Sequence, residues 1–128
     1  MHAPTRILTI YFDGGCPLCR REIRWYQHLR TREPVAWVDL DERRGEPPAP
    51  DLGFEQAMRL FHARCPSAGL LVGVDGFIRL WQAFPVLRPL ALIASFRPIK
   101  AVLGKAYEVF AARRWRKRCA DGACGLVP

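Results

Sequence analysis

The chain has 128 residues, of which half are hydrophobic and a quarter are charged, an ordinary composition for a globular protein. This length fits one domain that can bury a hydrophobic core without disulfide staples. The most apolar stretch, residues 84–96, is interrupted by two prolines and an arginine. It falls short of the roughly 20 apolar residues of a transmembrane helix, which excludes a membrane-spanning segment.

The formal net charge of +8 is distributed unevenly. Residues 1–85 carry 11 Lys and Arg against 10 Asp and Glu, whereas residues 86–128 carry 9 against 2. The densest basic run is residues 113–118. Such a run could bind nucleic acid or anionic lipid. We favour the simpler interpretation of a solvated helix end whose cations complement the helix dipole.

Residues 1–6 lead directly into an apolar run without the charged and apolar regions of a secretory signal, so we expect a cytoplasmic protein. The chain contains five cysteines. In a reducing compartment we expect them to be catalytic, metal-binding or free thiols rather than structural disulfides.

Residues 7–19 carry the strongest chemical signal in the chain. The β-branched and aromatic run of residues 7–12 predicts a buried strand, and Asp13-Gly14-Gly15 ends it with a tight turn. Cys16-Pro17-Leu18-Cys19 then opens a predicted amphipathic helix over residues 17–30. The pattern therefore places a C-x-x-C motif at a strand-to-helix junction.

This position suggests a role for each cysteine. Cys16 lies near the helix N-terminus, where free N–H groups and the helix dipole stabilise a thiolate, so we expect it to be the attacking thiol at the edge of the fold. Cys19 lies three residues later on the same helix face, so we expect a more buried, resolving thiol. A bare C-x-x-C is also half of a zinc site, but the strand and Gly-Gly context favours redox chemistry.

Four neighbouring residues complete the predicted site. The Asp13 carboxylate can accept N–H bonds within the Gly-Gly turn, which is the role we favour, or it can carry a proton near the thiols. Phe12, Pro17 and Leu18 are expected to form an apolar rim on which a substrate rests.

The sequence Phe12-Asp13-Gly14-Gly15-Cys16-Pro17-Leu18-Cys19 resembles the signature of the DCC family of thiol-disulfide oxidoreductases, which is named for a D-x-x-C-x-x-C motif. Residues 58–63, residues 72–81 and the basic helical tail are also similar to that family. The resemblance implies a thioredoxin-like fold and dithiol–disulfide exchange. Residues 54–58 lack the proline that thioredoxins place before their third strand, so we do not expect the thioredoxin mode of substrate binding.

The rest of the predicted core follows from turns and periodicity. Its elements are a strand over 35–40, a loop over 41–50, a short helix over 51–56, strands over 57–63 and 70–73, and a helix capped by Asp75 that runs to about residue 84. The resulting order, β-α-β-(α)-β-β-α, is the thioredoxin order, so the predicted fold class is α/β.

We expect two parts within one domain, a thioredoxin-like core over 1–85 and a basic helical extension over 86–128 that packs on it. The extension is predicted to form helices over 87–95 and 98–118. An apolar stripe on the second helix is expected to face the core, and it comprises Ile99, Val102, Leu103, Ala106, Val109 and Phe110.

Cys119 and Cys124 form a second pair with C-x4-C spacing around an Asp-Gly turn. They could be a second redox pair that exchanges with Cys16 and Cys19, half of a four-cysteine zinc site completed by that pair, or passive thiols. Cys65, in a turn before a proline, is expected to be a lone thiol without a partner.

These patterns predict an enzyme that exchanges a dithiol and a disulfide through Cys16 and Cys19, with a protein or small-molecule disulfide as substrate and no organic cofactor. One alternative is a structural zinc module that uses Cys16, Cys19, Cys119 and Cys124. The other is a binding module whose basic helix engages nucleic acid, which we consider less favoured, or an anionic membrane.

Overall fold

The computed structural model describes residues 7–122 and contains a four-stranded mixed sheet with the strand order β2-β1-β3-β4. Its strands are β1 (Leu8–Phe12), β2 (Val35–Asp39), β3 (His62–Cys65) and β4 (Gly69–Val72). Strand β1 pairs parallel with β2 and antiparallel with β3, and β3 pairs antiparallel with β4. The parallel pair requires a crossover, which is provided by the helix that begins at Pro17 within the C-x-x-C motif.

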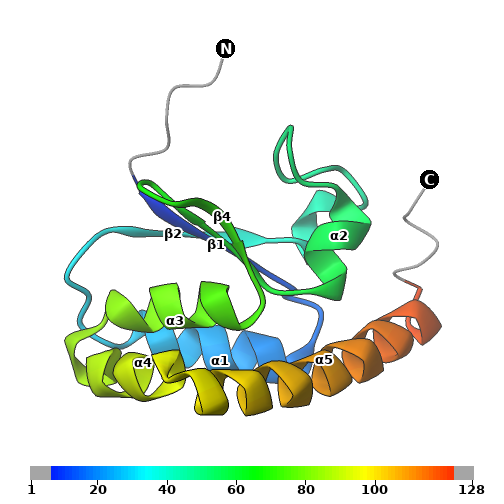
Figure 1. Ribbon diagram of the computed structural model, residues 1–128. Helices are drawn as coiled ribbons and strands as arrows, with labels where there is room; N and C mark the ends of the chain where they lie inside the picture. Colours follow the sequence, from blue (N-terminus) through cyan, green and yellow to red (C-terminus); the bar gives the residue numbers. More distant parts are fainter. Residues whose placement is uncertain (1–6, 123–128) are drawn as a thin grey trace.

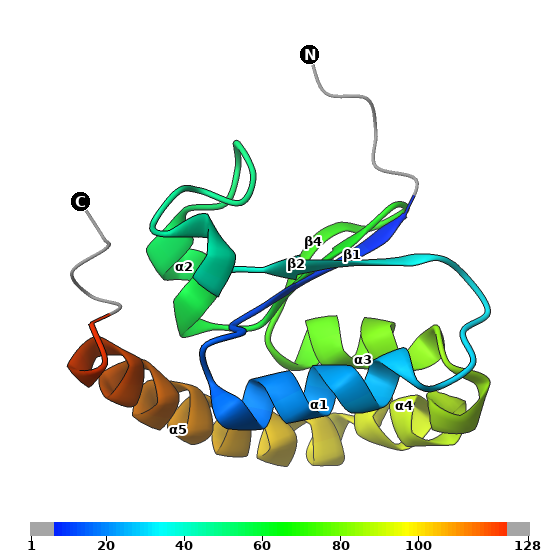
Figure 2. The ribbon, with the colours of Figure 1, turned by 180° about the vertical axis from the view of Figure 1, so that it is seen from behind.

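The helices cover both faces of this sheet. They are α1 (Pro17–Gln27), α2 (Phe54–Arg59), α3 (Val74–Gln82), α4 (Arg88–Ser95) and α5 (Arg97–Ala120), with short 3-10 turns at Asp41–Arg43 and Pro85–Leu87. Helices α1 and α3 lie against one face, and α2 lies on the other (Figure 1). Helices α4 and α5 form a further layer outside α1 and α3, and Figure 2 shows the same layers from behind.

Strand β1 separates two hydrophobic clusters because its successive side chains point to opposite faces. Leu8 and Ile10 lie in the cluster between the sheet and helices α1 and α3. Tyr11 points the other way, into a cluster that also holds Met58 of α2 and Trp115 of α5. Helix α5 is therefore part of the core on the face opposite α1, although most of its length runs beneath that helix (Figure 1).

The predicted fold class is confirmed. The element order is that of a thioredoxin-like fold, with two additional C-terminal helices. The boundary between the short helix and the third strand was predicted wrongly. Residues 57–59 belong to α2 rather than to a strand, and β3 begins only at His62. Ala57 and Met58 are buried on one side of α2, and a short apolar run of this kind does not distinguish a buried helix from a buried strand.

Helix α3 begins one residue after Gly73, so the prediction that Asp75 caps it was wrong. Gly73 has a φ of +64°, which glycine adopts more readily than other residues, and this conformation lets β4 pass directly into the helix. The Asp75 carboxylate instead forms an ion pair with Lys100 of α5, at 2.5 Å.

The apolar stripe predicted to pack α5 on the core lies largely at the surface. Val102 and Val109 are 69% and 55% exposed, whereas α5 buries Ala111 and Trp115. Helix α4 behaves similarly, since it buries two alanines, Ala91 and Ala94, and leaves its larger apolar side chains exposed. The two C-terminal helices thus pack through three alanines and one tryptophan and present an apolar outer face.

Candidate active site

In the turn after β1, the backbone of Gly14 and Gly15 lies close to charged side chains. The N–H of Gly14 donates to Asp39 Oδ1 of β2 at 3.0 Å, and the N–H of Gly15 donates to Asp13 Oδ1 at 3.0 Å. A Cβ atom at Gly14 would overlap the Asp39 carboxylate, and one at Gly15 would overlap the Arg118 guanidinium. Glycine is therefore required at both positions, because any larger residue would clash with a charged side chain packed against the turn.

Cys16 is the N-cap residue of α1, and Pro17 occupies the first helical turn, as predicted. The Cys16 and Cys19 thiols are neighbours, and the interaction with Cys16 contributes to a raised pKa of Cys19. The prediction that Cys19 is more buried was wrong, since Cys16 is 8% and Cys19 9% exposed. The second half of α5 lies beside this end of α1, so Cys16 does not lie at an open edge of the fold (Figure 2).

The two thiols line different pockets. Cys19 lines a small inner pocket of about 30 Å³ together with Asp13, Glu22 and Arg114. Cys16 lines an outer pocket of about 320 Å³ between the start of α1 and the second half of α5. The predicted apolar rim divides in the same way, because Phe12 lines the inner pocket whereas Pro17 and Leu18 line the outer one.

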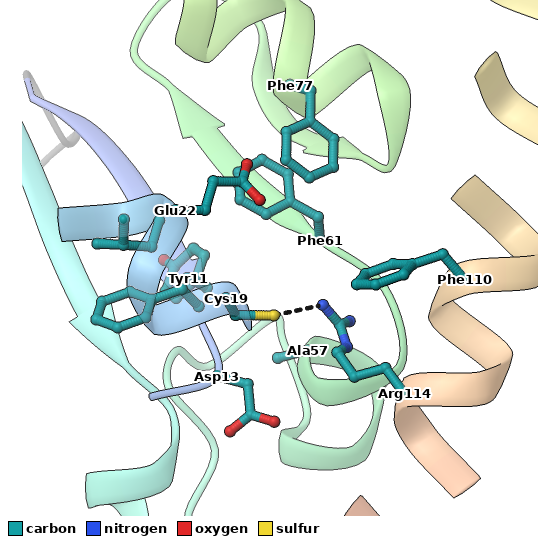
Figure 3. A pocket seen from close by; sticks show the side chains of 11 residues that line it. Tyr11, Asp13, Cys19, Glu22, Ala57, Phe61, Phe77, Phe110 and Arg114 are labelled. Carbon is teal, nitrogen blue, oxygen red and sulfur yellow. Dashed lines mark hydrogen bonds between the residues drawn. The ribbon is translucent and has the colours of Figure 1, made fainter. Parts of the chain in front are cut away.

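Arg114 of α5 contacts the dithiol directly. Its Nη1 donates to Cys19 Sγ at 3.4 Å (Figure 3). Its Nη2 donates to the Met58 carbonyl at 3.0 Å. Burial raises the pKa of the Cys19 thiol to about 12 although the charge of Arg114 opposes the rise. The positive charge of Arg114 therefore favours the thiolate form of Cys19.

Asp13 is 3% exposed and forms an ion pair with Arg118, whose Nε lies 2.8 Å from Asp13 Oδ2. The same guanidinium contacts Asp41 Oδ1 at 2.8 Å. Together with the bond from Gly15, these contacts give Asp13 a structural role, since it joins the turn to α5. A role for Asp13 as a proton carrier stays a prediction.

Glu22 is a further carboxyl group beside the dithiol that the sequence did not indicate. It lies one turn after Cys19 on α1 and lines the inner pocket (Figure 3). Tyr26 donates its hydroxyl hydrogen to Glu22 Oε1 at 2.8 Å and accepts a hydrogen bond from Trp81 Nε1 at 2.9 Å. Burial raises the pKa of Glu22, with the Tyr26 bond and the charge of Arg114 acting in the opposite direction.

Arg114 and Arg118 were also missed as site residues. The only signal was the basic run of residues 113–118, which we interpreted as a solvated helix end. Their four-residue spacing puts them on one face of α5, but nothing local to that helix indicates that the face meets the motif.

The remaining cysteines have different surroundings. Cys65 is a free thiol, as predicted, but its sulfur has hydrogen-bond partners, since it lies 3.1 Å from Arg79 Nε and 3.4 Å from Ser67 Oγ. Burial favours the neutral thiol, but these hydrogen bonds outweigh it and lower the pKa of Cys65 to about 7. Cys119 is half-buried at the end of α5 and is disulfide-bonded, so the expectation of free thiols was wrong for this cysteine. Cys124 lies outside the described residues, so a second redox pair stays a prediction.

Within residues 7–122, no group of three or more His, Cys, Asp and Glu side chains is arranged to hold a metal ion. This range includes Cys16, Cys19 and Cys119 but not Cys124, so the four-cysteine zinc alternative also stays a prediction. None of the helices in the same range is both long and apolar enough to cross a membrane.

Comparison with known proteins agrees with the geometry of the motif. No curated protein and no solved structure matches the chain. The family described as DCC1-like thiol-disulfide oxidoreductase matches residues 10–120, which include the end of β1, the C-x-x-C motif and all of α5. The chain belongs to the DCC1-like thiol-disulfide oxidoreductase family.

Proposed function

We propose that this protein catalyses thiol–disulfide exchange with Cys16 as the attacking thiol and Cys19 as the resolving thiol. The observation that carries the proposal is the pair of neighbouring free thiols at the start of α1, of which only Cys16 lines the larger pocket. A substrate disulfide in the outer pocket meets Cys16 first. Cys19 is then within reach of the Cys16 sulfur for the second exchange.

In the reductive direction, the Cys16 thiolate attacks one sulfur of the substrate disulfide, and the other sulfur leaves as a thiolate. The free N–H groups at the start of α1 favour negative charge on Cys16. Cys19 then attacks the Cys16 sulfur, closes the Cys16–Cys19 disulfide and releases the second substrate thiolate. The protein dithiol loses two electrons, the substrate gains them, and the two thiol protons pass to the products.

The resolving step depends on deprotonating Cys19. Its pKa of about 12 leaves little thiolate near neutral pH, so its proton must move as the bond forms. The Arg114 guanidinium, which donates to the Cys19 sulfur, stabilises the negative charge at that moment. Arg114 thus acts directly on a reacting atom in this proposal.

Trapping of the mixed disulfide tests the assignment. Reduced Cys19→Ser should accumulate a mixed disulfide on Cys16 with a small disulfide, as detected by mass spectrometry, whereas Cys16→Ser should not accumulate one on Cys19. Cys65→Ser is the control, because Cys65 lies away from the motif against Arg79. Trapping on Cys19 instead, or protection of all thiols until a chelator is added, would contradict the proposal, and the second result would favour zinc.

The outer face of α4 and α5 favours a second candidate function, adsorption to an anionic membrane surface. Leu92, Phe96 and Val102 are 75%, 62% and 69% exposed, and residues 86–118 carry six exposed Lys and Arg against one exposed Glu. Exposed apolar side chains enter the lipid interface, while cations are attracted to anionic headgroups. Nucleic acid would use the cations but not the apolar side chains.

Cosedimentation with vesicles tests this second candidate. We expect binding to vesicles that contain phosphatidylserine, weaker binding to neutral vesicles, and a loss in the double variant Leu92→Ser/Phe96→Ser. Cys16→Ser should bind vesicles like the unmodified protein, since Cys16 lines a pocket that includes neither Leu92 nor Phe96. Equal sedimentation of the double variant would contradict membrane adsorption.

A further inference from the structure

The outer pocket over Cys16 is bounded by α5 on one side and by the start of α1 on the other. Pro17, Leu18 and Phe110 form its apolar wall. Its charged lining comprises Arg113, Arg114, Lys117, Arg118 and Asp121. Four cations against one carboxylate thus surround the space in front of the sulfur that we propose attacks the substrate.

These cations differ in how far their charge is already neutralised. Arg118 is paired with Asp13 and Asp41, and Asp121 Oδ2 lies 3.8 Å from its Nη1. The two remaining exposed cations, Arg113 and Lys117, have no ion-pair partner among residues 7–122. They lie one helical turn apart on the same face of α5. The rim of the pocket therefore keeps an uncompensated positive charge.

We propose that this pocket selects disulfides of small thiols that carry carboxylate groups. The inference rests on the proposed exchange chemistry at Cys16 and adds the class of substrate. A volume of about 320 Å³ is at the lower end of the range for small-molecule sites and accommodates one half of a small disulfide. Guanidinium and ammonium groups bind carboxylates by charge-assisted hydrogen bonds, and the apolar wall contacts the carbon chain.

The reaction with such a substrate balances without a further reagent. The Cys16 thiolate forms a bond to one sulfur of the disulfide and displaces the first carboxylated thiolate. Cys19 then forms the Cys16–Cys19 bond and displaces the second. One protein dithiol is oxidised by two electrons, one substrate disulfide is reduced to two thiols, and the protons of Cys16 and Cys19 end on those thiols.

The test is a single-turnover reaction of the reduced full chain with three disulfides of similar size and different charge. They are 3,3′-dithiodipropionic acid, which is a dianion, bis(2-hydroxyethyl) disulfide, which is neutral, and cystamine, which is a dication. Rates of Cys16–Cys19 oxidation are measured by acid quenching, alkylation and mass spectrometry, and each is divided by the rate of the same disulfide with 2-mercaptoethanol. We expect the normalised rate to be about fivefold or more higher for the dianion than for the neutral disulfide, lower for the dication, and less different at high salt.

The double variant Arg113→Gln/Lys117→Gln removes the two unpaired cations of the rim. It should lower the ratio of the dianion rate to the neutral rate about fivefold, since each exposed charge contributes modestly. The matched control is Lys105→Gln/Arg116→Gln, which removes one lysine and one arginine that are exposed on α5 but do not line the pocket. This control should keep the ratio of the unmodified protein.

The outcomes separate the inference from the proposed function. Oxidation by all three disulfides at the same normalised rate would overturn the substrate class while leaving exchange at Cys16 intact. An equal loss of the ratio in both double variants would also overturn it, because the net charge of the protein and not the pocket would then be responsible. Absence of reaction with every disulfide would overturn the proposed function itself.

Discussion

Arg114 lies 95 residues from Cys19 in the chain, yet its guanidinium donates to the sulfur of that cysteine. The contact matters because Cys19 is buried and would otherwise hold its proton still more tightly. Arg114 is also held by the carbonyl of Met58, a contact that does not involve the thiol. A distant helix thus influences the residue that completes the exchange.

Replacement of Arg114 tests this influence. Arg114→Gln should slow resolution of the mixed disulfide about tenfold, the factor expected for one lost charge-assisted hydrogen bond of about 1.4 kcal/mol. The pH profile of Cys19 alkylation should also move to higher pH, because the opposing positive charge is gone. Arg114→Lys should restore part of both effects, and Arg116→Gln is the control at an exposed site. An unchanged alkylation profile in Arg114→Gln would contradict the assigned role.

Glu22 predicts a pH dependence of stability. Its pKa in the folded protein is raised by burial above the ordinary value of 4.5, so the folded state binds more protons than the unfolded state between the two pKa values. The contribution of Glu22 is therefore present below pH 4.5 and is lost as pH rises through the raised pKa. Glu22→Gln keeps an oxygen for the Tyr26 hydroxyl but carries no charge at high pH. The melting temperature of this variant minus that of the unmodified protein should therefore be a few degrees larger at pH 8 than at pH 4.5. Parallel melting profiles would contradict this.

At the scale of elements, α5 shows which face of a helix packs. Its buried residues are Ala111 and Trp115, and Trp115 joins Tyr11, Leu40 and Met58 in the second cluster. Val102 and Val109 are hydrophobic and were expected to pack, but both side chains are more than half exposed. Hydrophobic spacing alone therefore did not identify the packed face.

Two substitutions in α5 distinguish these faces by stability. Trp115→Ala should lower the free energy of unfolding by about 3–5 kcal/mol, because it leaves a large cavity in the second cluster. Val102→Ser should change it by less than about 0.5 kcal/mol, because the side chain is 69% exposed. Both values come from urea denaturation followed by circular dichroism. A larger cost at Val102 than at Trp115 would show that the opposite face packs.

The junction between α5 and the motif predicts energetic coupling between Asp13 and Arg118. Removing one partner leaves the other charge buried, so Arg118→Gln and Asp13→Asn should each lower the free energy of unfolding by about 2–4 kcal/mol. The double variant should lose clearly less than the sum of the two. Urea denaturation of all four proteins gives the coupling energy. Additive losses would indicate that the pair does not stabilise this junction.

For the whole molecule, α5 closes the structure around the end of β1. Its contacts include the Tyr107 hydroxyl, which accepts the N–H of Phe61 next to β3, as well as Trp115 and Arg118. We therefore expect a fragment of residues 1–85 not to fold cooperatively, since it would lose cover from both hydrophobic clusters. The measurement is urea denaturation of the fragment by circular dichroism. A sigmoidal transition like that of the full chain would contradict this expectation.

The sequence by itself determined the strand, the Gly-Gly turn and the helix that carry Cys16 and Cys19, and it determined the order of the elements. These features depend on local physics, such as turn chemistry, capping and hydrophobic periodicity, which act within a few residues. The C-x-x-C motif was recognisable for the same reason, because its two thiols and its helix N-terminus are neighbours in the chain.

Only the tertiary structure decided which distant groups surround the dithiol. From the sequence, the arginines of α5 could either face water or pair with buried groups. The tertiary structure places Arg114 against Cys19 and Arg118 against Asp13. Likewise, the end of α2 and the packed face of α5 depend on which apolar side chains find space against β1. Such choices are made by burial between residues far apart in the chain, and local patterns do not encode them.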